Sequence, residues 1–136
     1  MSSTGVAVPA EPRAIVIGHG EFAAGMCSAV QKITGRGAAL VALSGQELSL
    51  PQIEDMLRTR LRDGGLTVIF TDLQAGSATM AARKVVRDSP GVVLVAGANL
   101  PMLLDFVMSA TVVAAEAAIH AAERGRTAII VHGAGA

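Results

Sequence analysis

The chain lacks tryptophan and tyrosine and has only three phenylalanines among its 136 residues. Proteins that bind single-stranded nucleic acid use aromatic side chains as platforms on which bases stack. The 11 basic and 11 acidic residues also cancel, so there is no excess of positive charge to attract a phosphate backbone. We therefore expect no nucleic-acid partner.

Long apolar runs are also missing, although 51% of the residues are hydrophobic. A membrane-spanning helix needs about 20 consecutive apolar residues. The longest candidate, residues 110–122, contains Glu116 and His120, and we interpret it as a mostly buried helix. We expect no direct insertion into a membrane.

Other signals of targeting or cross-linking are scarce. Residues 1–13 have no basic start followed by an apolar block, so we do not expect them to be a secretory signal, and their Pro, Ser and Gly content predicts a flexible tail. The single cysteine, Cys27, cannot form an internal disulfide, as is usual in a reducing compartment. We expect one domain over residues 14–136.

The most informative stretch of the chain is residues 14–20. Four apolar residues, 14–17, predict a strand that is buried on both faces, and this strand stops at Gly18-His19-Gly20. From residue 22 to residue 34, apolar side chains recur at helical spacing. His19 is therefore predicted between the end of a strand and the start of a helix, where α/β proteins bind ligands and where helix N–H groups favour an anion.

The same alternation of strand and helix continues through the chain. It predicts a three-layer α/β/α sandwich with a mostly parallel sheet. We expect the strand order 2-1-3-4, with a fifth, C-terminal strand at the edge. After residues 14–17, the predicted strands are residues 38–43, 66–70, 92–96 and 127–131.

Three of these strands end in a polar or glycine-containing loop, at His19, Asp72 and Asn99. Right-handed crossovers bring the carboxyl ends of parallel strands to the same edge of a sheet. We therefore expect the three loops to form one site.

This arrangement suits phosphoryl transfer through histidine. His19 would be the nucleophile, and Asp72 would orient the ring and stabilise the cation that forms on it. Backbone N–H groups at Gly20 and the start of the first helix, together with Gly76 and Ser77, would hold the phosphoryl oxygens.

Each of these residues also fits a structural role. A histidine at a strand end is often an ordinary loop residue, although glycines on both sides of His19 favour access to the ring. Asp72 and Asn99 are typical of turns, Ser77 of helix N-caps and Pro101 of a first helical turn.

Two other functional classes remain open from the residues alone. Residues 18–23 formally fit G-x-G-x-x-A, a dinucleotide-binding pattern, but no acidic residue directly follows the second strand, and we expect that these 136 residues leave no room for a substrate domain. A small metal chelatase would need a second ligand, and His120 and His132 lie at no recognisable metal spacing. We expect no metal or organic cofactor. His120 fits a packed or surface position, and the role of His132 is open.

Three segments together resemble the mannose-type IIA components of the sugar phosphotransferase system, a group that covers mannose, fructose, sorbose and N-acetylgalactosamine. They are Ile15-Val16-Ile17-Gly18-His19-Gly20 followed by Phe22-Ala23-Ala24-Gly25-Met26, then Phe70-Thr71-Asp72-Leu73, and finally Gly97-Ala98-Asn99-Leu100-Pro101-Met102-Leu103. The likeness covers nearly the whole chain after the tail.

The resemblance implies a cytoplasmic phosphotransferase. It would accept phosphate on His19 from the histidine-containing phosphocarrier protein, with Asp72 as the orienting aspartate, and pass it to a separate IIB component for sugar uptake. It also implies a homodimer in which the last strand, here residues 127–131, can exchange between subunits. Phe22, Asn99 and Pro101 are then expected at the rim of the site or against a partner.

One segment departs from that family. Asp72 is usually followed by a Gly-Gly-Thr/Ser-Pro turn, whereas residues 74–78 here read Gln-Ala-Gly-Ser-Ala. The Gly-Ser-Ala part is similar to the phosphocarrier subunit of dihydroxyacetone kinases, which is the alternative within this class. A regulatory module with the same chemistry at His19 is a further alternative.

Overall fold

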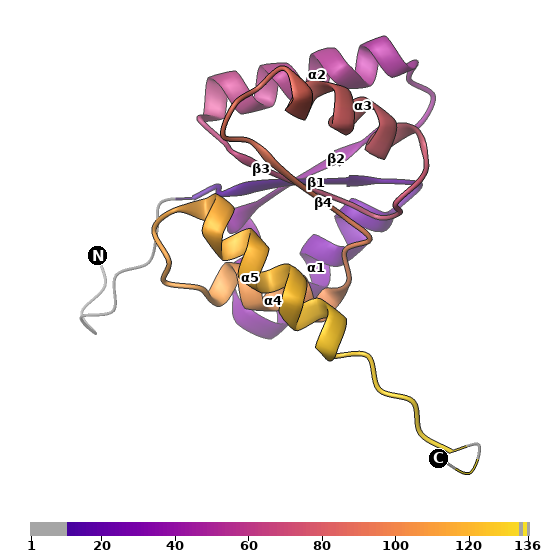
Figure 1. Cartoon of the computed structure of the whole chain (residues 1–136), viewed down its shortest axis with the longest axis vertical. Helices are drawn as coiled ribbons and strands as arrows, with labels where there is room; N and C mark the ends of the chain where they lie inside the picture. The colour runs from indigo at the N-terminus through magenta and orange to yellow at the C-terminus, as the bar shows by residue number, and fades with distance from the viewer. Residues whose placement is uncertain (1–10, 134, 136) are drawn as a thin grey trace.

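The computed structural model describes residues 11–133 and 135, and these residues form a three-layer α/β/α sandwich (Figure 1). The central sheet has four parallel strands in the order β2-β1-β3-β4, which confirms the expected fold class and strand order. The strands are β1 (Ala14–Gly18), β2 (Leu40–Ser44), β3 (Val68–Thr71) and β4 (Val93–Ala96).

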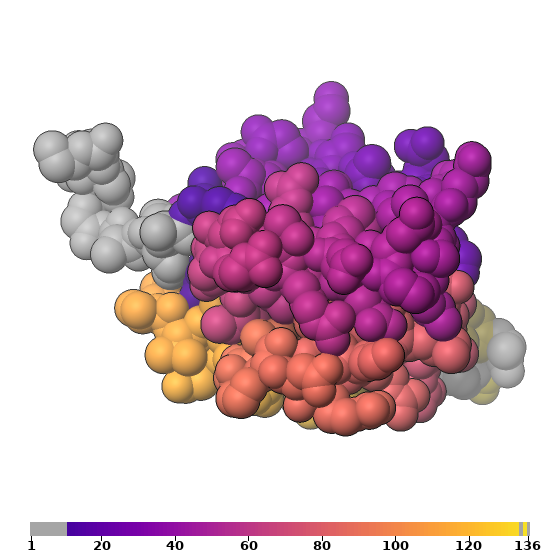
Figure 2. All heavy atoms as spheres, turned by 90° about the horizontal axis from the view of Figure 1, so that it is seen from above, coloured from indigo at the N-terminus to yellow at the C-terminus, as the bar shows by residue number. Residues whose placement is uncertain are grey.

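Helices cover both faces of the sheet. Helices α2 and α3 lie side by side on one face, as Figure 2 shows from above, and α1, α4 and α5 lie on the other (Figure 1). A short 3₁₀ turn, η1 (Gly37–Ala39), leads into β2. The helices are α1 (Phe22–Thr34), α2 (Leu50–Gly64), α3 (Ser77–Arg87), α4 (Leu100–Met108) and α5 (Ala114–Thr127).

The central strand β1 joins two hydrophobic cores. Side chains alternate along a strand, so Ile15 and Ile17 pack into the core beneath α2 and α3. Val16 packs into the core on the opposite face, with residues of α1, α4 and α5. This burial on both faces explains why β1 is continuously apolar, and it fixes the position of the loop that follows.

The prediction of a helix over residues 110–122 is wrong for its first residues. Helix α4 ends at Met108 and α5 starts at Ala114, so residues 109–113 form a connection between them. The guanidinium of Arg13 donates hydrogen bonds to the carbonyl oxygens of Thr111 and Val112. These carbonyls therefore accept hydrogen bonds from the side chain of the residue just before β1, and not from the N–H groups of a further helical turn.

The expected fifth strand, residues 127–131, is also absent from the described part of the chain. Thr127 is the last residue of α5, and the following residues extend away from the sheet (Figure 1). Ile129, Ile130 and Val131 are 71%, 70% and 76% exposed. A strand needs a neighbouring backbone to pair with, and among the described residues Ile129, Ile130 and Val131 take part in no backbone-to-backbone hydrogen bond.

Residues 1–10, most of the predicted flexible tail, lie outside the described residues. Arg13, at the end of that predicted tail, is buried, and its guanidinium lies 5.2 Å from the ring centroid of Phe106. Desolvation lowers the pKa of Arg13. Within the part of the chain that the structure describes, no helix is both long and apolar enough to cross a membrane.

Candidate active site

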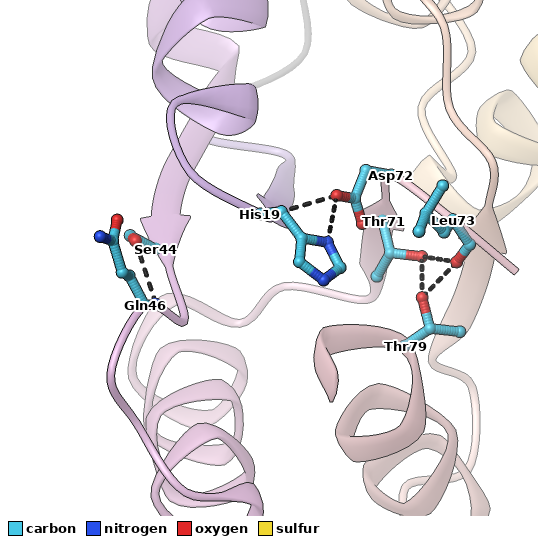
Figure 3. Close-up of polar contacts among 7 residues, drawn as sticks. All are labelled: His19, Ser44, Gln46, Thr71, Asp72, Leu73 and Thr79. Atoms are coloured by element: carbon cyan, nitrogen blue, oxygen red, sulfur yellow. Dashed lines mark hydrogen bonds and ion pairs between the residues drawn. The ribbon is translucent and has the colours of Figure 1, made fainter. Parts of the chain in front are cut away.

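The two predicted catalytic residues are brought together by the strand order. His19 follows β1 and Asp72 follows β3, and β1 and β3 are neighbours in which Ile17 is level with Thr71. Asp72 Oδ2 accepts two hydrogen bonds of 2.8 Å, one from the backbone N–H of His19 and one from its ring Nδ1 (Figure 3). The carboxylate therefore fixes both the backbone and the ring of His19.

The pair is asymmetric in its exposure. The imidazole of His19 is 62% exposed, whereas the side chain of Asp72 is 10% exposed. Burial raises the pKa of Asp72, but the hydrogen bonds from the backbone and ring of His19 outweigh it and hold the pKa below its usual range. A carboxylate bound to Nδ1 favours the tautomer that carries its proton on Nδ1, so Nε2 is left as the exposed nitrogen with a free lone pair.

Two glycines make room for the side chains of the site, because neither has a Cβ atom. A Cβ on Gly18 would lie 2.7 Å from Cγ of Asp72 and 2.8 Å from Cδ2 of Phe22. A Cβ on Gly76 would lie 2.9 Å from Cε1 of the His19 ring, and Gly76 also has a φ of +124°. Gly18 thus leaves room for the carboxylate, and Gly76 forms a wall beside the imidazole.

A pocket of about 250 Å³ opens next to the ring. Two predicted phosphate-binding residues, Gly20 and Ser77, line it, and the third, Gly76, lies against the imidazole. The other lining residues are Gly18, His19, Gly45, Gln46, Glu47, Leu48, Ile53 and Ala78.

The start of α3 makes this pocket suitable for an anion. The first N–H groups of an α-helix have no acceptor within the helix, and in α3 the N–H of Met80 is the first to bond back, to the carbonyl of Gly76. The N–H groups of Ser77 and Ala78 precede it, and both residues line the pocket. Free N–H groups and the positive end of the helix dipole favour a negatively charged group here.

One wall of the pocket comes from a loop that was not among the predicted site residues. The loop from Gly45 to Leu48, between β2 and α2, lies on the other side of His19 from Asp72 (Figure 3). Since β2 neighbours β1, the carboxyl end of β2 had to lie beside that of β1. Glu47 in this loop has a φ of +63°, a conformation that is uncommon for residues other than glycine.

The three residues expected at the rim lie in different places. Phe22 is half-buried next to Gly18 and packs against the core beneath it. Asn99 and Pro101 do not line the His19 pocket. Asn99 caps α4 by accepting a hydrogen bond from the N–H of Met102, and it donates one to the carbonyl of Gly125 in α5.

The other two histidines lie outside the pocket. His120 is exposed and places Nδ1 2.9 Å from Oδ2 of Asp105, which joins α5 to α4. His132 is exposed beyond α5. Among residues 11–133 and 135, no group of three or more His, Cys, Asp or Glu side chains is arranged to hold a metal ion.

The fold and site together define a parallel α/β domain that presents a histidine–aspartate pair in an anion-attracting pocket at the carboxyl edge of its sheet. The chain belongs to the family of IIA components of the phosphotransferase system (PTS) that is described as the PTS system fructose IIA component, whose family model matches residues 13–123. The general activity of this family is phosphotransfer. Membership favours that chemistry over the dinucleotide-binding and chelatase alternatives.

Solved structures of similar proteins show the same fold. The mannose/sorbose-specific IIA subunit from Enterococcus faecalis is 23% identical with a TM-score of 0.76, over 91% of this chain and 96% of that one. A PTS IIA protein associated with the fucose utilization operon of Streptococcus pneumoniae is 18% identical with a TM-score of 0.74, over 92% of this chain and 96% of the other.

A third similar structure is a putative phosphoenolpyruvate-dependent sugar PTS permease from Klebsiella pneumoniae. It is 25% identical with a TM-score of 0.75, over 88% of this chain and 89% of that one. No curated protein matches the sequence.

Proposed function

We propose that this protein is a phosphohistidine carrier that accepts phosphate on Nε2 of His19 from the histidine-containing phosphocarrier protein and passes it to a separate IIB component for sugar uptake. The observation that carries this proposal is the 2.8 Å contact between Nδ1 of His19 and Asp72, since it leaves Nε2 exposed at a pocket lined by free helix N–H groups. Membership of the PTS IIA family supports the same conclusion.

In the proposed reaction, the lone pair of Nε2 attacks the phosphorus of the donor phosphohistidine. The N–P bond of the donor breaks, and its electron pair stays on the donor's imidazole nitrogen. The ring of His19 becomes a phosphorylated imidazolium, whose charge is balanced by the carboxylate of Asp72 at Nδ1. Transfer to the IIB component is the same step with His19 as the donor, so the reaction needs no cofactor.

The N–H groups of Ser77 and Ala78, at the start of α3, are proposed to bind the phosphoryl oxygens. Positioning and charge stabilisation account for most of the rate of phosphoryl transfer. Gly20, with a φ of +50°, turns the chain so that the side of the imidazole facing the pocket stays open.

The proposal includes a cytoplasmic homodimer, as the family resemblance implies. Two features of the described chain support a dimer: β4 is an edge strand, and the β-branched side chains of Ile129, Ile130 and Val131 are exposed. Pairing of this segment with a second copy would satisfy its backbone and cover its side chains.

Phosphate incorporation from phosphoenolpyruvate tests the function. Purified chain is incubated with enzyme I and the histidine-containing phosphocarrier protein, and the product is tested for acid lability. We expect one acid-labile, base-stable phosphate per chain, lost in His19→Ala and retained in His120→Ala, whose histidine is also paired with an aspartate.

Equal labelling of the His19→Ala variant, or no labelling of the wild-type chain by active donors, contradicts the proposal. Onward transfer to a IIB protein separates the sugar-uptake role from its alternatives. Transfer to the subunits of a dihydroxyacetone kinase instead would identify the phosphocarrier subunit of that system.

A further inference from the structure

The loop between β3 and α3 carries much of the site but has few backbone contacts. It runs from Asp72 to Gly76, and Leu73, Gln74 and Ala75 in it are exposed. Within the described residues, none of these three takes part in a backbone-to-backbone hydrogen bond outside the helices and strands. Something other than the backbone must therefore hold the loop.

Two buried threonines hold it. The hydroxyl of Thr79, in the first turn of α3, lies 2.7 Å from that of Thr71, the last residue of β3. Thr79 also donates a hydrogen bond to the carbonyl of Leu73, and the Thr71 hydroxyl lies 3.4 Å from the same oxygen (Figure 3). Thr71 and Thr79 are 0% and 2% exposed, so water does not compete for these contacts.

The arrangement satisfies both hydroxyl protons. Each hydroxyl has one proton to donate and two lone pairs to accept with. Either Thr79 donates to Thr71 and Thr71 donates to the carbonyl of Leu73, or Thr79 donates to that carbonyl and Thr71 donates to Thr79. In both arrangements the carbonyl and both hydroxyl protons have a partner. Buried networks in which every polar group has a partner are rigid, so the Leu73 carbonyl is fixed to the end of β3 and to α3 together.

The anchored carbonyl lies between the two groups that touch His19. Asp72, one residue before Leu73, binds Nδ1 of the ring. Gly76, three residues after it, lies against the ring carbon next to Nε2 and is the N-cap of α3. A shift of the loop would therefore change the distance between the imidazole and the N–H groups of the helix start.

We propose that Thr79 is a positioning residue: together with Thr71 it anchors the carbonyl of Leu73 and so fixes Gly76 and the start of α3 beside Nε2 of His19. This rests on the proposed function, in which those N–H groups bind the phosphoryl oxygens. Thr79 does not touch the phosphoryl group and acts through the loop.

The test compares Thr79→Val, which keeps the shape of the side chain and removes the hydroxyl, with Thr79→Ser, which keeps the hydroxyl. In transfer from the phosphorylated carrier protein, Thr79→Val should lower kcat roughly 10- to 100-fold, as small misplacements of reacting groups do. KM for the donor should change little, because Thr79 is buried and the substitution changes no surface side chain. Thr79→Ser should recover most of the rate.

Thr34→Val is the matched control. The Thr34 hydroxyl donates to the carbonyl of Val30 and accepts from the N–H of Arg36, at the end of α1 remote from His19. Loss of the Thr34 hydroxyl should lower the melting temperature about as much as loss of the Thr79 hydroxyl does. It should leave kcat unchanged. An equal fall of kcat in both variants, or no rescue by Thr79→Ser, overturns the positioning role.

A second measurement uses phosphoramidate, a small phosphoryl donor that needs no partner protein. Nε2 of His19 attacks its phosphorus, the P–N bond breaks and ammonia leaves. His120 also has a carboxylate on Nδ1 and a similarly exposed ring, so it serves as an internal reference in the same sample. Thr79→Val should lower the ratio of phosphate on His19 to phosphate on His120, as measured by peptide mass spectrometry.

This ratio separates the two proposals. If the carrier protein does not label the wild-type chain but the ratio falls in Thr79→Val, the proposed function fails and the positioning role stands. If the carrier protein labels the chain and the ratio is unchanged in Thr79→Val, the function stands and the positioning role is wrong.

Discussion

Gly76 lies so close to His19 that a methyl group on it would come within 2.9 Å of the ring carbon Cε1. The glycine is held there by the loop that also presents Asp72 to Nδ1 of the same ring. The imidazole is thus fixed on one nitrogen and flanked at the carbon between its nitrogens, with only Nε2 directed at the pocket.

Gly76→Ala should displace the ring of His19. The added methyl group would overlap Cε1, and the φ of +124° at this position is strained for any L-residue. We expect the initial rate of phosphate labelling to fall by about 100-fold, which is typical of a misplacement near 1 Å. Gly65→Ala is the control, because Gly65 also has a positive φ but has open space around it. If Gly65→Ala slows labelling as much, backbone strain and not the contact with His19 is responsible.

Asp72→Asn should slow phosphoryl transfer without removing the acceptor. The amide cannot balance the positive charge that forms on the ring, so a loss of roughly 100-fold is expected, as for other preorganised electrostatic groups. Asp105→Asn removes the charge from the equivalent contact with His120, outside the pocket, and should leave the rate unchanged. Single-turnover transfer from the phosphorylated carrier protein measures both, and a normal rate in Asp72→Asn would rule out the charge-balancing role.

The same carboxylate should make the fold sensitive to acid. Its folded pKa lies below the ordinary value of 3.8, so the folded protein holds the ionised form more strongly than the unfolded chain does. This stabilisation is complete above the ordinary value and is lost as the pH falls from there through the folded pKa. Urea unfolding at about pH 5 and about pH 3 measures the loss, which should be smaller in Asp72→Asn. An equal loss in the variant would assign acid sensitivity to other carboxylates.

Asn99→Ala should destabilise the fold and spare the chemistry. It removes the cap of α4 and the hydrogen bond to the carbonyl of Gly125, which together should cost about 1–2 kcal/mol of unfolding free energy. Labelling of His19 by phosphoramidate should stay at the wild-type rate, because Asn99 does not line the pocket. A large fall in the labelling rate with a small loss of stability would show that Asn99 contributes to the chemistry at His19.

Ile130→Lys should shift the proposed dimer to monomers. A charge in the exposed apolar segment would have to be buried when a second copy pairs with it. Sedimentation velocity should find a dimer for the wild-type chain and a monomer for the variant. Ile33→Lys, at an exposed position on α1, is the control and should remain dimeric. A monomeric wild-type chain would contradict the dimer.

The strands and the main site residues were predictable because local chemistry dominates there. The apolar run of β1 favours a strand covered on both faces, and parallel strands bring their carboxyl ends to one edge, so His19 and Asp72 could be expected together. In the first turn of α2, Ser49 and Gln52 each bond the backbone of the other, a capping box that local contacts alone stabilise.

The failures occurred where distant contacts outweigh local preference. At the break between α4 and α5, the carbonyl of Thr111 accepts a hydrogen bond from Arg13, which lies 98 residues earlier in the chain. The last apolar run favours a strand, but a strand forms only where another backbone offers hydrogen bonds, and no described residue offers them to Ile129, Ile130 or Val131.

From the sequence by itself came the parallel α/β architecture and the pairing of a histidine with an aspartate at one edge of the sheet. Only the tertiary structure decided that the loop between β2 and α2 completes the pocket, that Asn99 ties α4 to α5 away from it, and that Thr71 and Thr79 anchor the loop beside His19. Apolar periodicity records which side chains are buried. The distances between loops are set by hydrogen bonds among residues whose separation in space is fixed only once the whole sheet has formed.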